Sequence, residues 1–285
     1  MEKSAYPRIK HVIILCIIFL GIQILGGLVL GLNQLLLQIG TESLAFGIGT
    51  IILYIVSFAV IIYIGFKKTG KKFNEVFLLN NVSSGVWVSV IIFMFGFVII
   101  SSEIDNLITY ILPMPAFLEE TFQTMINNDY FIVSVILVGI LPAIFEEFFF
   151  RGVVISGFRE NYPQVKTILV SALLFGFIHL NPYQFVTAFL IGIIMAWSLF
   201  KTNSILPAMY MHFFNNMTAV IVMRFNNVFY IEGFNAVYGE HSFQPWWFNL
   251  IGIALTGAGA WLFIKEIKKT KVTEKNEPAV IEDTP

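Results

Sequence analysis

Cysteine and charge are both scarce in this sequence. Cys16 is the only cysteine among 285 residues, and 12% of the residues are charged. A single cysteine excludes an intrachain disulfide framework and a zinc site built on cysteines. The formal net charge of −1 gives no basic surface of the kind that nucleic-acid binding needs, so we expect no nucleic-acid partner. No internal repeat is evident, and no polar link is long enough to form a soluble domain.

Apolar residues are abundant instead. They make up 57% of the chain, whereas a soluble domain contains about 45–50%. They occur in runs of about 20 residues, which suffice to cross a hydrocarbon layer of about 30 Å. We therefore expect an all-α, polytopic integral membrane protein. About eight transmembrane helices are predicted, near residues 12–32, 43–66, 85–108, 130–158, 164–180, 183–200, 205–223 and 245–264.

Other segments have different patterns. Residues 116–129 alternate apolar and acidic side chains in a way that favours a short amphipathic surface helix. Residues 265–285 are charged and lack apolar periodicity, so we expect a tail without regular structure. We divide the chain into N-terminal helices with the amphipathic link (1–130), a core (131–222), and an outer loop with the last helix and tail (223–285).

The basic residues predict the orientation in the membrane, because lysine and arginine are enriched in cytoplasmic links. If the N-terminus is inside, the inside segments contain Lys3, Arg8, Lys10, Lys67, Lys68, Lys71, Lys72, Arg159, Lys166, Lys201, Lys265, Lys268, Lys269 and Lys271. The outside links contain one exception, Arg224. Both termini are therefore predicted to be cytoplasmic. With no organelle-targeting signal, the expected location is the cell membrane, with lipid as a partner.

Three charged residues interrupt the fourth apolar run. They are Glu146, Glu147 and Arg151, and each charge at the centre of a spanning helix costs about 2.5–3.5 kcal/mol. Glu147 and Arg151 are four residues apart and can pair along one helix face. Glu146 is turned about 100° away from Glu147, so it is free to face another partner.

The partners available to Glu146 are few. His179, His212, Asn215 and Asn216 are the other strongly polar side chains in the later helices. Glu146 lies about 15 residues before the turn near residues 161–163, and His179 lies about 16 after it. At a rise of about 1.5 Å per residue, both stand about 22–25 Å from that turn. His212, on a third helix, can reach the same depth.

This set of side chains indicates hydrolytic chemistry. A carboxylate beside a histidine can activate water, and a second histidine with an amide can stabilise an oxyanion. No serine or cysteine is obviously paired with a histidine, so attack by water is favoured over a covalent nucleophile. Glu146, His179 and His212 could also supply three ligands to zinc. Their spacing is not that of a His-Glu-x-x-His helix, so zinc and a metal-free mechanism both stay open.

The motifs resemble those of a known family. Glu146-Glu147-x-x-x-Arg151, Phe175-x-x-x-His179 and His212-x-x-x-Asn216 are similar, in this order, to the three motifs of the CAAX-protease and bacteriocin-processing (CPBP, or Abi) family of intramembrane proteases. The Ras-converting endopeptidase of the endoplasmic reticulum belongs to that family. The resemblance covers about residues 131–222.

The resemblance implies an eight-helix fold around a buried polar chamber open to water and membrane. It also implies a role for each motif residue. Glu146 and His179 would activate water, and His212 and Asn216 would form the oxyanion site. The pair Glu147–Arg151 would support them. Within the family, both a metalloprotease and a metal-free, glutamate-dependent mechanism are argued.

The sequence thus predicts an intramembrane endopeptidase that cleaves a membrane-associated protein or peptide. Two alternatives stay open. One is a non-enzymatic immunity or scaffold protein that binds a membrane peptide. The other is a transporter that uses the buried charges as an ion path.

Overall fold

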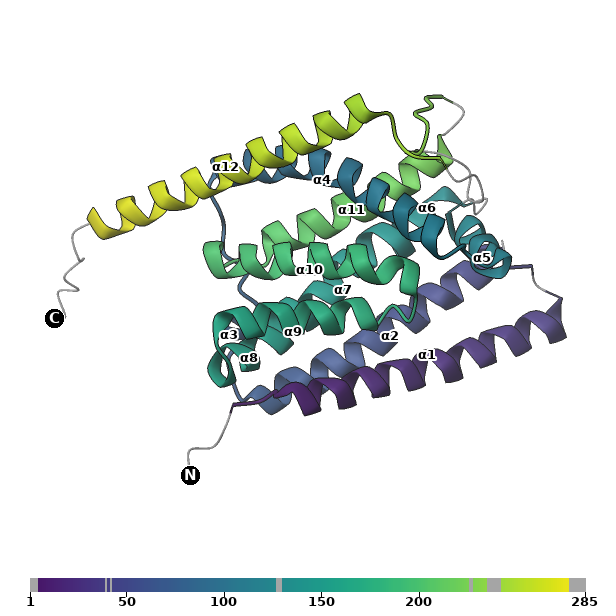
Figure 1. The fold of residues 1–285 in the computed structure, drawn as a ribbon. Coiled ribbons are helices and arrows are strands. Elements are labelled where there is room, and N and C mark those ends of the chain that lie inside the picture. Colours follow the sequence, from purple (N-terminus) through teal and green to yellow (C-terminus); the bar gives the residue numbers. More distant parts are fainter. Residues whose placement is uncertain are drawn as a thin grey trace.

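The structure is a computed structural model that describes residues 5–38, 40–41, 43–126, 130–225, 228–234 and 242–276. Every regular element within these ranges is a helix (Figure 1). Six of the described helices are long and apolar enough to cross a membrane: α1 (Ile9–Leu37), α2 (Leu44–Thr69), α4 (Ser84–Ile111), the helix over Phe131–Asn161, α10 (Pro182–Thr202) and α12 (Trp246–Asn276). The chain is therefore a polytopic all-α membrane protein, as predicted.

The predicted count of eight spanning helices is not confirmed. The fifth predicted helix, α9 (Gln164–Phe177), is apolar but has only 14 residues, fewer than the roughly 20 needed to cross a bilayer. The seventh, α11 (Leu206–Arg224), is not among the six. It carries His212, Asn215 and Asn216, which reduce its apolar character.

Successive long helices run in opposite directions. The described start of α1 and the end of α12 lie on one side of the molecule, on the left in Figure 1, with the short helix α3 (Phe73–Val76) and the α8–α9 turn. The amphipathic helix α5 (Ala116–Ile126) lies on the opposite side. Its predicted last residues, 127–129, are outside the described ranges.

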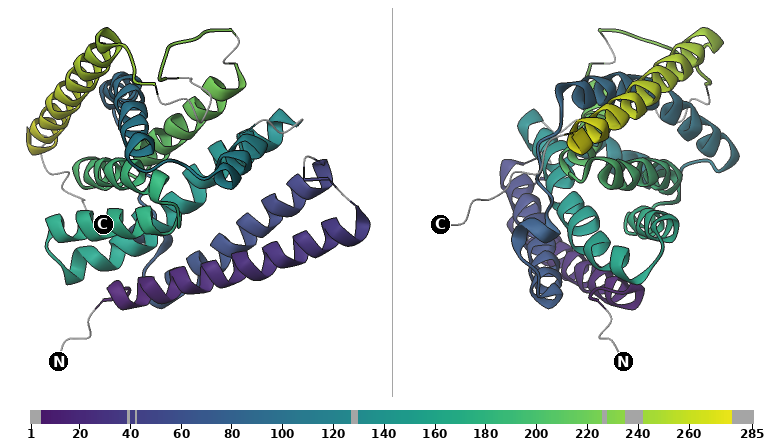
Figure 2. Two further views of the ribbon diagram at one scale, coloured as in Figure 1. Left: turned by 45° about the vertical axis from the view of Figure 1, so that its right-hand side comes forward. Right: turned by 90° about the vertical axis from the view of Figure 1, so that its left-hand side faces the viewer.

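The last helix packs along α4 over much of its length (Figure 2). Gly96 of α4 faces the backbone of α12 so closely that a Cβ there would collide with the backbone nitrogen of Thr256. Small residues allow such close contact between helices in a membrane, where helices associate by packing because the hydrophobic effect does not drive them together.

The prediction of an unstructured segment from residue 265 is wrong over its first part, because α12 continues to Asn276. Lysine and glutamate are good helix formers, so charge alone does not end the helix.

The central helix contains two stretches of π-helix that the sequence did not predict. It comprises α6 (Phe131–Ser134), η1 (Val135–Ile140), α7 (Leu141–Glu147), η2 (Phe148–Val154) and α8 (Ile155–Asn161). The π-helical turns η1 and η2 flank the segment that ends with the two glutamates. Such wide turns are rare and occur frequently at functional sites. The central helix contacts α2 on one side and α11 on another.

Candidate active site

The pair predicted within the central helix is present and fully buried. Nη1 of Arg151 lies 2.9 Å from Oε1 of Glu147, and both side chains are 0% exposed. Nη2 of Arg151 donates to the carbonyl of Gly192 on α10 at 3.1 Å. The guanidinium also lies over the ring of Phe175, 4.6 Å from its centroid. These contacts offset the cost of burying the charge.

His212 of α11 joins this pair. Its Nδ1 lies 2.8 Å from Oε1 of Glu147. Because an ionised carboxylate only accepts hydrogen bonds, Nδ1 must carry the proton, which leaves Nε2 as the second functional nitrogen. That Nε2 lies 3.9 Å from Oε2 of Glu146. A carboxylate that orients a histidine in this way fixes both its tautomer and its direction.

Glu146 is 8% exposed, and its two carboxylate oxygens have different surroundings. Oε1 accepts a 2.7 Å hydrogen bond from the hydroxyl of Tyr54 on α2. Oε2 is buried and has no hydrogen-bond donor among the described residues. Tyr54 was not among the site residues predicted from the sequence. The one feature that could have indicated it is a hydroxyl in the middle of an apolar segment, where lipid offers no hydrogen-bond partner.

His179 lies in the turn after α9 rather than within a helix. The predicted helix to residue 180 is too long, because α9 ends at Phe177 and Leu180 adopts a left-handed conformation with φ of 50°. The next helix starts at once: Asn181 caps α10 by accepting from the backbone of Tyr183 at 3.1 Å, and Pro182 occupies the first turn. Asparagine followed by proline favours such a start.

The turn still brings His179 back over the preceding helix. Its Nδ1 lies 2.8 Å from the carbonyl oxygen of Phe175, so Nδ1 carries the proton and Nε2 is an acceptor. Within the described part of the chain, no hydrogen bond or ion pair joins His179 to Glu146. The imidazole nearer to Glu146 is that of His212.

Phe175 contacts both imidazoles. Its ring is perpendicular to those of His179 and His212, with centroid distances of 5.2 and 5.5 Å. Both histidines therefore pack against one buried aromatic side chain. Among the residues that the structure describes, no three His, Cys, Asp or Glu side chains are grouped so as to hold a metal ion.

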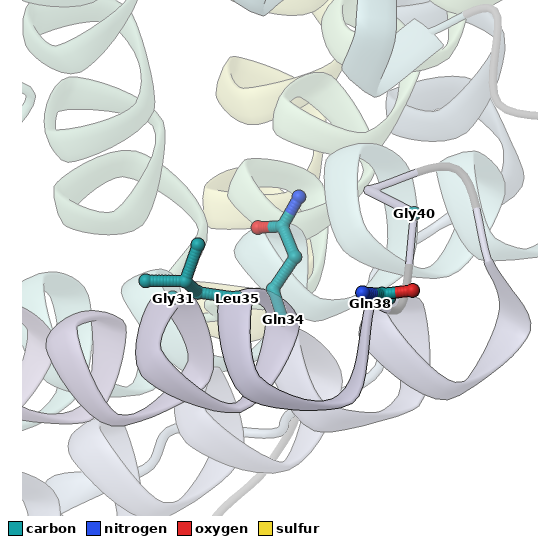
Figure 3. Close-up of a pocket in the computed structure, with 5 residues that line it drawn as sticks. All are labelled: Gly31, Gln34, Leu35, Gln38 and Gly40. Atoms are coloured by element: carbon teal, nitrogen blue, oxygen red, sulfur yellow. The ribbon is translucent and has the colours of Figure 1, made fainter.

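The set Glu146, His179 and His212 does not fit a three-ligand zinc site in this arrangement, so we assign no step to a metal. An open recess elsewhere on the molecule contains no residue that could hydrolyse a peptide bond. It has a volume of about 590 Å³ and lies at the C-terminal end of α1, lined by Gly31, Gln34, Leu35, Gln38 and Gly40 (Figure 3). None of these residues belongs to the candidate site.

Asn216 binds a carbonyl of the central helix. Nδ2 of Asn216 donates to the carbonyl of Val138 at 2.8 Å. Val138 lies in the π-helical turn η1. An α-helical register would pair that carbonyl with the N–H of residue 142, which Pro142 lacks. The side chain of Asn216 supplies a donor from α11, and Asn215 donates to Oδ1 of Asn216 at 3.3 Å. Gly139 allows the close approach, because Met217 of α11 lies directly against it.

A family model matches the segment that contains these site residues. Residues 128–218, about one third of the chain, match the family model described as "Type II CAAX prenyl endopeptidase Rce1-like". Searches of curated proteins and of solved structures gave no match. The matched segment contains Glu146, Glu147, Arg151, Phe175, His179, His212 and Asn216, and leaves out Tyr54. Residues 128–218 are thus similar to the type II CAAX prenyl endopeptidase Rce1-like family, which confirms the resemblance to the CAAX protease family that the three motifs predicted.

Proposed function

We propose that this protein is an intramembrane endopeptidase that hydrolyses a peptide bond in a membrane-associated protein or peptide. One observation carries the proposal. A buried glutamate in a membrane-spanning helix directs one carboxylate oxygen toward an oriented imidazole, and this oxygen accepts no hydrogen bond from the described residues. Oε2 of Glu146 and Nε2 of His212 are these two groups, 3.9 Å apart. The match to the Rce1-like family supports the same activity.

The separation of these two atoms suits a shared water molecule. A single water can lie at about 2.8 Å from both atoms and donate one hydrogen to each. Glu146 then takes one proton while the water oxygen attacks the carbonyl carbon of the substrate. The C–O bond forms as the carbonyl electrons move to oxygen, which gives a tetrahedral intermediate. Glu146 thus keeps the role of base that the sequence predicts, with His212 as its nearer partner.

The other polar groups can assist the later steps. Asn216 uses one amide N–H on Val138 and keeps a second for the oxyanion. Nε2 of His212 becomes a donor once a proton from Glu146 reaches it. That proton passes to the leaving nitrogen as the C–N bond breaks and the carbonyl reforms. His179 binds the carbonyl of Phe175 through Nδ1, so its Nε2 can accept a hydrogen bond from substrate or water.

The substrate class follows from the family description. We propose a peptide bond near the C-terminus of a lipid-anchored or membrane-embedded chain. The probe is a quenched fluorescent peptide ending in a CAAX sequence, in a farnesylated and an unmodified form, added to the purified protein in lipid vesicles. We expect wild-type protein to cleave and Glu146→Gln to lose at least about a hundredfold in rate. Faster cleavage of the farnesylated form would assign the anchor as a specificity element.

A matched control lies on the same helix. Glu160 of α8 pairs with Lys71 and its side chain is 48% exposed, so Glu160→Gln should cleave at the wild-type rate. Equal rates for wild type and Glu146→Gln would overturn the proposal. A cellular phenotype that survives Glu146→Gln would instead favour the immunity or scaffold hypothesis, and proton- or ion-coupled flux into vesicles would favour transport.

We also propose that both termini face the cytoplasm, as the lysine distribution predicts. Cysteine labelling tests this in a Cys16→Ser background. Lys166 lies at the start of α9 on the side of the termini, and Val228 lies in the link after α11 on the opposite side. In intact cells a membrane-impermeant maleimide should label Val228→Cys and spare Lys166→Cys. The reverse pattern would place the termini outside.

A further inference from the structure

Tyr54 lies on α2, about 75 residues before the segment that carries the family match. Its hydroxyl makes the one hydrogen bond that Glu146 receives within the described residues, at 2.7 Å. We infer that Tyr54 is a positioning residue of the active site, which binds Oε1 of Glu146 and thereby directs Oε2 toward the reacting water. This inference rests on the proposed function, in which Glu146 is the base.

The ring of Tyr54 is held in place by its neighbours. It packs against Phe58 one turn further along α2, with a centroid distance of 4.9 Å. Phe58 is 1% exposed and also contacts Phe145, the residue before Glu146, at 6.5 Å. Tyr54 is therefore fixed by an aromatic cluster that connects α2 directly to the segment bearing the base. A hydroxyl fixed in this way loses little freedom when it donates, which favours a strong and directional hydrogen bond.

The charges around Glu146 show why this donor matters. Glu147 follows it on the same helix, and Arg151 is committed to Glu147. His212 approaches from α11 but its Nε2 is 3.9 Å away, too far for a hydrogen bond. His179, in the turn after α9, makes no hydrogen bond or ion pair with Glu146 within the described residues. The hydroxyl of Tyr54, from α2, is thus the group that offsets the loss of water around the buried carboxylate.

Removing the hydroxyl should affect catalysis. The carboxylate of Glu146 loses both its donor and the contact that sets its direction. For Tyr54→Phe we therefore expect kcat to fall by about tenfold to a hundredfold with KM changed less than about twofold.

The matched control is Tyr63→Phe, which removes the same hydroxyl from the same helix. Tyr63 is 63% exposed and lies outside the site, so kcat and KM should stay as in wild type. A role in stability alone would lower the melting temperature of Tyr54→Phe and leave the kcat of the folded protein at the wild-type value. That result would overturn the inference.

A spectroscopic measurement separates this inference from the proposed function. The infrared carboxylate band that disappears in Glu146→Gln identifies Glu146 in the full-length protein in vesicles, without any substrate. In Tyr54→Phe the frequency of this band should differ from that in wild type and in Tyr63→Phe, because the carboxylate has lost a hydrogen bond. If the CAAX peptide is not cleaved but the band shifts, the protease proposal fails and the contact between Tyr54 and Glu146 stands. A band at the wild-type frequency would overturn the positioning role, whether or not the peptide is cleaved.

Discussion

Nδ1 of His212 lies 2.8 Å from Oε1 of Glu147, although 65 residues separate them in the sequence. This contact joins α11 to the central helix at the centre of the membrane-embedded core. It also gives Glu147 a double function, because the same oxygen binds Arg151 at 2.9 Å. The residue that neutralises a buried guanidinium therefore also orients the imidazole next to Glu146.

This double function predicts strong coupling between Glu147 and Arg151. Removal of one partner leaves an uncompensated buried charge, which costs about 3–5 kcal/mol. We expect Glu147→Leu and Arg151→Met each to lower the unfolding free energy in detergent by this order. The double variant should lose clearly less than the sum, because no unpaired charge remains. Additive losses would contradict the pairing. Arg159→Met, at an exposed position on the same helix, should leave stability almost unchanged.

The two histidines should differ in stability rather than in activity. His212 is buried and binds Glu147, so His212→Ala leaves Glu147 with one donor fewer and should cost about 1–3 kcal/mol. His179 is half-buried, lies in a turn and binds only a backbone carbonyl, so His179→Ala should lower the melting temperature little. Both variants should lose peptide cleavage. Activity in His179→Ala at the wild-type level would remove His179 from the proposed site.

We expect Pro142→Ala to restore part of the stability that Asn216→Ala removes, but not the peptide cleavage. Asn216→Ala leaves the carbonyl of Val138 without the donor seen at 2.8 Å, at a cost of about 1–3 kcal/mol. In a Pro142→Ala background the restored N–H can bind that carbonyl, so the same change should cost less. Cleavage should stay low in both backgrounds, because the oxyanion donor is missing. Full recovery of cleavage in the double variant would show that Asn216 acts only through the helix.

Asn215→Ala is the matched control for this pair. Asn215 is adjacent on α11 and donates only to Asn216, over a longer distance of 3.3 Å. Its removal should therefore lower both cleavage and stability by much less than Asn216→Ala does. Equal losses from the two variants would indicate a general weakening of α11.

The pair of Glu147 and Arg151 could be predicted from the sequence because it lies within one helix. A spacing of four residues sets the contact almost independently of the rest of the fold. The approach of His212 to the acidic residues followed from depth alone, since a rise of about 1.5 Å per residue places side chains on neighbouring helices at comparable levels. The helix rise gives the level of a side chain along the helix axis, but not the direction in which the side chain points.

Direction is where the predictions from the sequence were incomplete. Whether Glu146 meets His179 or His212 depends on the rotation of the helices and on Phe175, which contacts both imidazoles. The donor on Tyr54 comes from a helix 92 residues away in the sequence, and no local pattern indicates it. The π-helical turns beside the glutamates are likewise not encoded by an apolar periodicity of 3.6 residues.

Two glycines of α12 provide a test of the packing that supports the site. A Cβ at Gly259 would collide with the backbone of Phe93 on α4, whereas one at Gly257 would meet nothing within 4 Å. Gly259→Ala forces the helices apart and should destabilise by about 1–3 kcal/mol. Gly257→Ala, two residues away, removes backbone freedom from the unfolded chain and should be neutral or stabilising by up to about 1 kcal/mol. Unfolding in detergent measures both, and equal effects would contradict the close contact between α4 and α12.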